Sequence, residues 1–486
     1  MRETILVREW YRKHMAKFGF FRNVGALSGS RVVVVLLQFA ALPVIARYLT
    51  TAEFGLVALA MSVVVFCQTL SDAGLGRSLI RQPIYDRAEW SSVFWFLAAV
   101  GLGLGALVVM VSGPLAALFG APELRPLLQV FGVMPFLSAV TAIPAAFMEK
   151  HNRFAPLATV RLGSALAGLA IAVVLAVAGA GAWALVAQQI SVAAIDLVAI
   201  WLLSNFRPAA ALRANDLERH YGFARDNIGV SLLFTAQRQL PVMLIGYVLG
   251  SSTLGLYAMS QRLLRLPLMG FSGPFSQVVY VRMARVQAEP ARVGDLYVES
   301  VRAMALVVLP PMLLVAAIGE QTFSLLFSEA WRQSGLVYAL AAPGVALEVA
   351  TSAAGVAFQA TGQTGIRLRM AAERAVLRTT AIALAIPFGI EAAALAITAF
   401  ALLYLPRFWA YLKQAVPFSE VTALKALIGP SLASLAGGVA LALWLPTETG
   451  IAGLLLWLLS ALLAAWLLAA ALQPRALHRC AAILNG

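Results

Sequence analysis

Residues 90–112, which read WSSVFWFLAAVGLGLGALVVMVS, contain no charged side chain. A helix needs about 20 mostly apolar residues to cross the hydrocarbon core of a bilayer, and this stretch is long enough. Comparable segments recur along the chain, so the pattern predicts an all-α polytopic membrane protein with about 14 transmembrane helices. The predicted spans are 23–48, 54–79, 90–112, 123–148, 155–178, 182–204, 226–249, 255–281, 296–318, 334–360, 367–388, 392–412, 421–445 and 451–472.

The composition of the 486 residues agrees with this fold class. The chain is 61% hydrophobic and 12% charged, with a mean hydropathy of +0.85, whereas an average soluble domain has about 25% charged residues. These values exclude a disordered chain and an ordinary cytosolic enzyme. Two distant cysteines, Cys67 and Cys480, and four scattered histidines predict neither a disulfide framework nor a metal site. The chain has no phosphate-binding loop, so we expect no ATP-driven pump. We also expect no cofactor and no enzyme.

The formal net charge of +14 is concentrated in alternate connections between the predicted spans. The odd-numbered connections contain one basic residue, Arg332, whereas the even-numbered ones and both ends are rich in Arg and Lys. By the positive-inside rule, the even connections and both termini are predicted to be cytoplasmic. Residues 1–22 are expected to be a basic amphipathic segment on the inner leaflet, or alternatively a solvated tail that only sets orientation. Residues 473–486 are expected to form a cytoplasmic tail.

A short motif occurs twice, at equivalent outer connections. Leu42-Pro43-Val44 precedes FGLVA at 54–58, and Leu240-Pro241-Val242 precedes LGLYA at 254–258, so that Gly55 and Gly255 are 200 residues apart. This distance equals six predicted spans, and an even number of spans gives the two copies the same orientation. A chance match in a chain rich in Leu, Gly and Ala is the alternative. The repeat predicts two six-helix lobes, at 23–204 and 226–412, a cytoplasmic linker at 205–225, and an extra helix pair at 413–472.

Three stretches carry a resemblance to a known family. These are NVGALSGSRVVVVLLQFAALPVIARYLTTAE at 23–53 with FGLVALA at 54–60, DAGLGRSLIRQ at 72–82, and LGLYAMSQRLLRLP at 254–267. They resemble the Wzx-type polysaccharide flippases of the multidrug/oligosaccharidyl-lipid/polysaccharide (MOP) exporter superfamily, in particular the lipopolysaccharide and colanic-acid exporter branch. The resemblance implies a bacterial inner-membrane protein that carries an oligosaccharide repeat unit on undecaprenyl diphosphate from the cytoplasmic to the periplasmic leaflet.

Charged residues inside the predicted spans are the candidate functional residues, because each costs about 2.5–3.5 kcal/mol at the bilayer centre. Arg31 and Asp72 lie at matching depths in the first two spans, where they form either a structural ion pair or a headgroup contact. The other deep cations outnumber the other deep acids, and we interpret the excess as a partly basic cavity that binds the substrate headgroup. The deep cations are Arg238, Arg262, Arg265 and Arg378, and the deep acids are Asp196 and Glu348.

These residues support the hypothesis of a flippase that works by alternating access, for exopolysaccharide, O-antigen or capsule biosynthesis. Its partners are expected to be the lipid-linked oligosaccharide and membrane lipids, with a polysaccharide polymerase or co-polymerase and H⁺ or Na⁺ as further candidates. If an ion is coupled, Asp72, Asp196 and Glu348 are the candidate sites. No nucleic-acid partner is expected. The alternatives are a multidrug/cation antiporter of the same superfamily, a membrane polysaccharide polymerase or ligase, and a scaffold subunit of an export complex.

Overall fold

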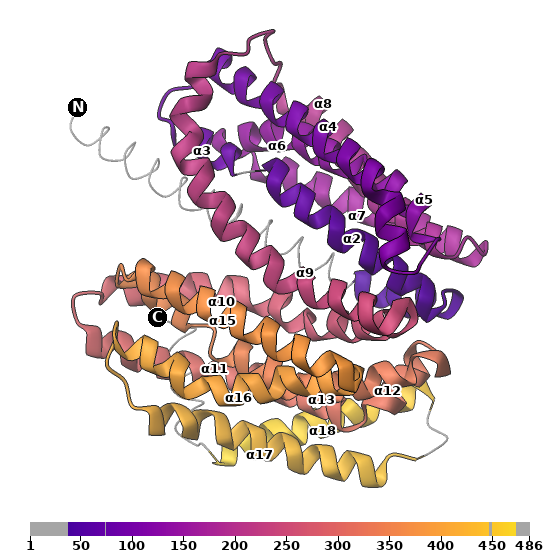
Figure 1. The fold of residues 1–486 in the computed structure, drawn as a ribbon. Coiled ribbons are helices and arrows are strands. Elements are labelled where there is room, and N and C mark those ends of the chain that lie inside the picture. Colours follow the sequence, from indigo (N-terminus) through magenta and orange to yellow (C-terminus); the bar gives the residue numbers. More distant parts are fainter. Residues whose placement is uncertain (1–36, 73, 447–449, 473–486) are drawn as a thin grey trace, which may run out of the picture. The chain divides into compact units, whose positions relative to one another are not determined.

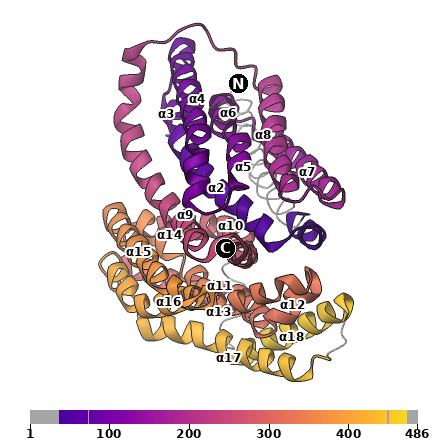
Figure 2. The ribbon, with the colours of Figure 1, turned by 45° about the vertical axis from the view of Figure 1, so that its right-hand side comes forward.

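The computed structural model describes residues 37–72, 74–446 and 450–472. Within these residues the regular structure is entirely helical, as the sequence predicts, and it forms two compact units (Figures 1 and 2). Unit 1 contains the described residues up to Tyr48, together with Ala60–Ala117 and Pro122–Thr235. Unit 2 contains Leu49–Leu59, Leu118–Ala121 and the described residues from Ala236 onward.

The helices of unit 1 follow the predicted spans closely. Residues 37–48 are helical. Gly74, in the left-handed conformation (φ 71°), precedes the helix Leu75–Arg81, and Asn205, which is also left-handed (φ 57°), follows the helix Ala182–Ser204. The helices are α2 (Thr51–Asp72, whose first turns belong to unit 2), α3 (Leu75–Arg81), α4 (Arg87–Leu118), α5 (Leu124–Phe131), α6 (Met134–Lys150), α7 (Phe154–Val177), α8 (Ala182–Ser204) and the first part of α9 (Ala214–Leu264).

The core of unit 1 lies where α3, α4 and α6 meet the first part of α9. Trp90 of α4 is fully buried there, with Leu79 of α3 and Ile143 of α6. Phe206, in the connection after α8, is also buried in this cluster. The segment 205–225, expected to be a linker, is therefore packed into unit 1, and its second half is helical.

Unit 2 contains the remaining helices. The backbone is helical throughout α9 except at Gly250 (φ 80°, ψ 173°), which marks the predicted connection between the seventh and eighth spans. The elements that follow are α10 (Leu266–Arg285), α11 (Pro290–Ala317), α12 (Gly319–Leu326), η1 (Glu329–Trp331), α13 (Arg332–Ala350), α14 (Ala354–Ala360), α15 (Thr364–Ala385), η2 (Ile386–Phe388), α16 (Ile390–Lys413), α17 (Glu420–Trp444) and α18 (Ile451–Leu472).

Helix α11 is central in unit 2, because it packs against α13, α17 and α18. The last two helices are antiparallel neighbours, joined by a cluster of Ile318, Leu441 and Leu454. Across the described residues, 11 helices are long and apolar enough to cross a membrane. Helix α15, which contains four Arg and one Glu, is not among these 11 helices. Residues Asn227–Leu264 count as a single candidate span. The number of about 14 spans stays a prediction.

The two glycines of the repeated motif touch each other in unit 2. A Cβ atom added to Gly55 would lie 1.8 Å from the Ser251 carbonyl oxygen, and one added to Gly255 would lie 1.8 Å from the Thr51 carbonyl oxygen. Beside this crossing, the hydroxyls of Thr51 and Ser252 share a hydrogen bond of 2.8 Å. The start of α2 and the middle of α9 therefore approach backbone to backbone, which only residues without a side chain permit.

Candidate functional site

A carboxylate clamped between two guanidiniums lies in unit 2. Glu348 of α13 forms ion pairs with Arg374 Nη2 at 2.8 Å and with Arg378 Nη1 at 3.0 Å, both on α15. The arginines are four residues apart and so project from one face of the helix. The three side chains are only 17–25% exposed. One carboxylate balances one of the two positive charges, and the group keeps a net charge of +1.

Two more of the predicted arginines belong to the same electrostatic environment as this group. Arg265, at the junction of α9 and α10, interacts electrostatically with Arg238 of α9, with Arg378 and with the hydroxyl of Tyr257. Arg238 and Arg265 are both exposed. Four guanidiniums and one carboxylate thus share this part of unit 2, which we call the cationic cluster (Arg238, Arg265, Glu348, Arg374 and Arg378). Such a group attracts anions because full internal pairing is not possible.

The fourth predicted arginine has a different environment. The Arg262 guanidinium carbon lies 5.9 Å from the ring centre of Phe54, in cation–π geometry. Phe54 in turn makes an edge-to-face contact with Trp331 at 5.4 Å. The structure therefore places Arg262 against an aromatic pair. Arg262 lies seven residues after Gly255 in the sequence, and Phe54 is next to Gly55.

The gap beside the clamped carboxylate is small. Its lining includes Glu348, Thr351, Arg374 and Tyr404, and its volume is about 20 Å³, close to the roughly 10–15 Å³ that one buried water needs. In this conformation the space beside the carboxylate is too small for a sugar.

Asp196 lies in unit 1 and is held by neighbouring α7. Ser164 Oγ donates to Asp196 Oδ1 at 2.6 Å, and Arg161 interacts with the same carboxylate electrostatically. Arg161, on the predicted fifth span, is a charged neighbour that the candidate set did not include. Arg31 falls outside the described residues. Asp72 is the last residue of α2, but its side chain is not among those described, so their pairing stays a prediction.

A buried polar network fastens the start of α9 to unit 1. His220 is hydrogen-bonded through Nδ1 to Ser78 Oγ (2.7 Å) and through Nε2 to Glu89 Oε1 (3.0 Å). A neutral imidazole with its proton on Nε2 satisfies both contacts. Ser92 Oγ donates to Asp216 Oδ2 at 2.9 Å one turn earlier on α9. These polar side chains keep the segment before the seventh predicted span in one position.

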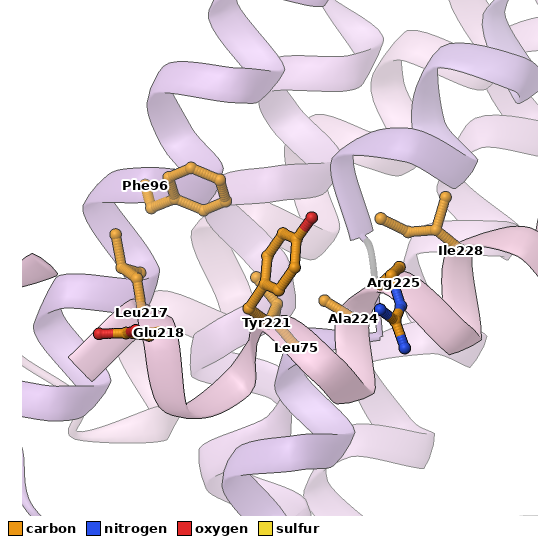
Figure 3. Close-up of a pocket in the computed structure, with 8 residues that line it drawn as sticks. All are labelled: Leu75, Phe96, Leu217, Glu218, Tyr221, Ala224, Arg225 and Ile228. Carbon is orange, nitrogen blue, oxygen red and sulfur yellow. The ribbon is translucent and has the colours of Figure 1, made fainter. Parts of the chain in front are cut away.

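A larger cavity opens next to this network, as Figure 3 shows. It has a volume of about 660 Å³ and lies between α3, α4 and α9. Tyr221 projects from α9 into the space between Phe96 and Ile228, and the charged side chains of Glu218 and Arg225 belong to the same α9 face. The lining is mostly apolar and contains none of the predicted site residues.

Three residues that contact the charged or polar groups described above were not predicted from the sequence: Arg374, Arg161 and His220. A signal existed for Arg374, since it lies four residues before Arg378 on one helical face. His220 and Glu89 lie in polar connecting segments of the sequence, where burial has no pattern. Among the described residues, no group of three or more His, Cys, Asp or Glu side chains could hold a metal ion.

Comparison with solved structures identifies the fold. The chain superimposes on the lipid II flippase MurJ in an inward closed conformation with a TM-score of 0.72, covering 93% of this chain and 98% of that one at 14% identity. An inward-facing multidrug resistance MATE transporter of the MOP superfamily matches with a TM-score of 0.58 over 80% of this chain and 99% of its own, also at 14% identity. The fold is therefore that of MurJ and MATE transporters.

Comparison with curated sequences gives relatives of similar kind. The succinoglycan biosynthesis transport protein ExoT of Rhizobium meliloti (strain 1021) is 26% identical over 74% of this chain and 73% of its own length. The lipopolysaccharide biosynthesis protein WzxC of Escherichia coli (strain K12) is 20% identical over 62% of this chain and 61% of its own length. A family model described as "polysaccharide biosynthesis protein" matches residues 44–335. Because that match covers more than half of the chain, this multi-pass membrane protein belongs to the polysaccharide biosynthesis protein family.

Proposed function

We propose that this protein is a flippase, which moves undecaprenyl-diphosphate-linked oligosaccharide repeat units from the cytoplasmic to the periplasmic leaflet of the bacterial inner membrane. The cationic cluster is the observation that carries this proposal. A guanidinium binds phosphate through two parallel N–H···O contacts, and a diphosphate offers enough oxygens for several arginines. The names of the relatives ExoT and WzxC, and the fold shared with MurJ, support the same substrate class.

The proposed mechanism is alternating access, in which two six-helix lobes move about a central substrate site. The crossing of Gly55 and Gly255 brings the two copies of the repeated motif together within unit 2. We assign both termini to the cytoplasm from the distribution of Arg and Lys in the connections. In this mechanism the substrate diphosphate is held by arginines while the polyprenyl chain remains in lipid.

Energy coupling is proposed to involve Asp196 rather than Glu348. The Glu348 carboxylate is paired with two guanidiniums, so its charge serves to hold Arg374 and Arg378 in position. The Asp196 carboxylate receives one short hydrogen bond from Ser164 and is half-buried, which leaves coordination sites for H⁺ or Na⁺. A downstream polymerase or co-polymerase that removes the product would supply a second driving force.

The test measures lipid-linked oligosaccharide in a deletion strain. Wild-type protein is expected to relieve its accumulation, whereas Arg238→Ala and Arg378→Ala are not. The matched control is Arg292→Ala, because Arg292 is exposed and forms an ion pair with the nearby Glu289, and this variant is expected to restore export. Quantitative immunoblotting of the membrane fraction shows that all variants reach the membrane.

Normal export by the Arg238→Ala/Arg378→Ala double variant would overturn the role of the cationic cluster. Loss of drug resistance with unchanged polysaccharide would instead support the multidrug/cation antiporter alternative, and the structurally similar MATE protein is named as a multidrug resistance transporter. The excess of cations in unit 2 disfavours that alternative, because a site for cationic drugs requires an excess of carboxylates.

A further inference from the structure

A second basic site lies in unit 2, away from the clamped carboxylate. A cavity of about 300 Å³ is lined by Arg369 of α15 and by Arg407, Ala410, Tyr411 and Gln414, at the end of α16 and just beyond it. Two guanidiniums, a phenol and an amide supply its polar groups, and no carboxylate is part of the lining. Its volume is at the lower end of the range of about 300–1,000 Å³ that small-molecule sites occupy.

Arg407 is fixed in position by its neighbours. Its Nε donates to Glu373 Oε1 at 3.1 Å, and its Nη2 donates to Glu373 Oε2 at 3.2 Å. The Tyr411 hydroxyl donates to the same carboxylate, so Glu373 is engaged on both oxygens. The two N–H groups on Nη1 make no hydrogen bond to the described residues, and they are available to a ligand.

Arg369 lines the same cavity as Arg407 and supplies the second cation. It is exposed and makes neither a hydrogen bond nor an ion pair within the described part of the chain. A pre-positioned guanidinium beside a second one without a partner is the arrangement that binds a phosphate group, because both present planar N–H donors.

Apolar side chains adjoin this polar site on the same helices. Leu403 precedes Arg407 by one turn and is 81% exposed, and Val376 follows Arg369 by two turns and is 59% exposed. Spacings of four and seven residues place each apolar residue on the same helical face as its arginine. The surface therefore offers cations at one end and hydrocarbon at the other, which matches an amphiphile with a phosphate headgroup.

We propose that Arg369 and Arg407 form a binding site for the phosphate headgroup of an anionic membrane lipid. Basic pockets between membrane helices at the cytoplasmic side bind such headgroups, and the charge pattern of the sequence assigns this end of α15 and α16 to that side. The lipid chains lie along Leu403 and Val376. The site contains no member of the cationic cluster, so this proposal does not depend on the proposed transport activity.

The experiment uses the purified full-length protein in a neutral detergent and measures its thermal melting during lipid titration. Phosphatidylglycerol is expected to raise the melting midpoint, and phosphatidylcholine at equal concentration is expected to have a much smaller effect. In Arg369→Gln the half-saturating concentration of phosphatidylglycerol is expected to rise about tenfold, which corresponds to the loss of one charge-assisted contact. Arg369→Lys keeps the charge without the planar donors and is expected to lie between the two.

Arg292→Gln is the matched control, since it removes another exposed arginine assigned to the same membrane side and should leave the titration unchanged. Inorganic phosphate separates the two sources of the anion. Equal stabilisation by inorganic phosphate would overturn the assignment to a lipid. An unchanged titration in Arg369→Gln, or an equal loss in Arg292→Gln, would overturn the site itself.

Discussion

The contact between Gly55 and Gly255 can be tested directly, because the position of an added methyl group at either glycine is known. In Gly255→Ala the new Cβ would lie 1.8 Å from the Thr51 carbonyl oxygen, while ordinary contact begins at 3.4 Å. The helices must therefore separate by about 1.6 Å at this point, the difference between those two distances. The atom that must move belongs to the backbone, so a change of side-chain rotamer cannot relieve the clash.

Overpacking of this kind typically costs about 1–3 kcal/mol. The cost is partly offset because Ala stabilises a helix interior by about 1 kcal/mol relative to Gly. The offset is measured with Gly103→Ala in α4, where a Cβ meets nothing within 4 Å. Since only the helix-forming term applies there, the difference between the two variants is expected to equal the steric cost, about 1–3 kcal/mol.

Thermal melting of the purified protein, together with relief of lipid-linked oligosaccharide accumulation, provides the assay. At roughly 2 °C per kcal/mol for a unit of this size, Gly255→Ala should melt about 2–6 °C below Gly103→Ala. Gly55→Ala should behave like Gly255→Ala, because its Cβ is equally close to the Ser251 carbonyl oxygen. Equal melting midpoints for Gly255→Ala and Gly103→Ala, with export intact in both, would refute the close crossing.

Three other substitutions test separate features of the molecule. Glu348→Gln leaves two guanidiniums without their shared counter-ion and is expected to lower the free energy of unfolding by about 1–3 kcal/mol; the partial exposure of the group keeps this loss modest. A chemical denaturation curve that matches wild type would contradict this expectation. His220→Ala leaves the buried Glu89 carboxylate without its His220 partner and is expected to lower the free energy of unfolding by about 1–3 kcal/mol. Limited proteolysis of residues 205–213 is expected to become faster, and unchanged cleavage would show that the network does not hold this segment. Asp196→Asn keeps an oxygen that accepts the Ser164 hydrogen bond, so folding is expected to be preserved. Export in vesicles is expected to lose its response to an imposed ion gradient, and a retained response would exclude Asp196 as the coupling site.

The sequence was sufficient to predict the all-helical fold class and the approximate positions of many helices, but not the breaks that divide predicted spans 54–79 and 123–148 into two helices each. Apolar length alone places a helix at 90–112, and the structure has α4 at Arg87–Leu118. The repeated motif identified Gly55 and Gly255 as equivalent positions. It did not predict that they touch, because a short repeat indicates orientation and not which helices pack together.

The site was predicted less completely, for physical reasons. Glu348 and Arg378 were both expected as buried charges, but their ion pair joins two helices across 30 residues of sequence, and helical periodicity carries no information on such a contact. Arg262 and Arg265 share a helical face by spacing, yet Arg262 contacts an aromatic ring while Arg265 interacts with other arginines. The role of each predicted residue in binding substrate stays a prediction.

The charge density of α15 has a consequence for how the protein enters the membrane. Each Arg near the centre of an inserting segment costs about 2.5–3.5 kcal/mol, and Arg374 and Arg378 lie near the middle of α15, so this helix is a poor candidate for leaving the translocon alone. Its carboxylate partner Glu348 is on α13, which is synthesised earlier, and Arg407, the partner of Glu373, is on α16, which is synthesised later. We therefore expect α13, α15 and α16 to enter the lipid together, because their ion pairs offset part of the positive charge of α15.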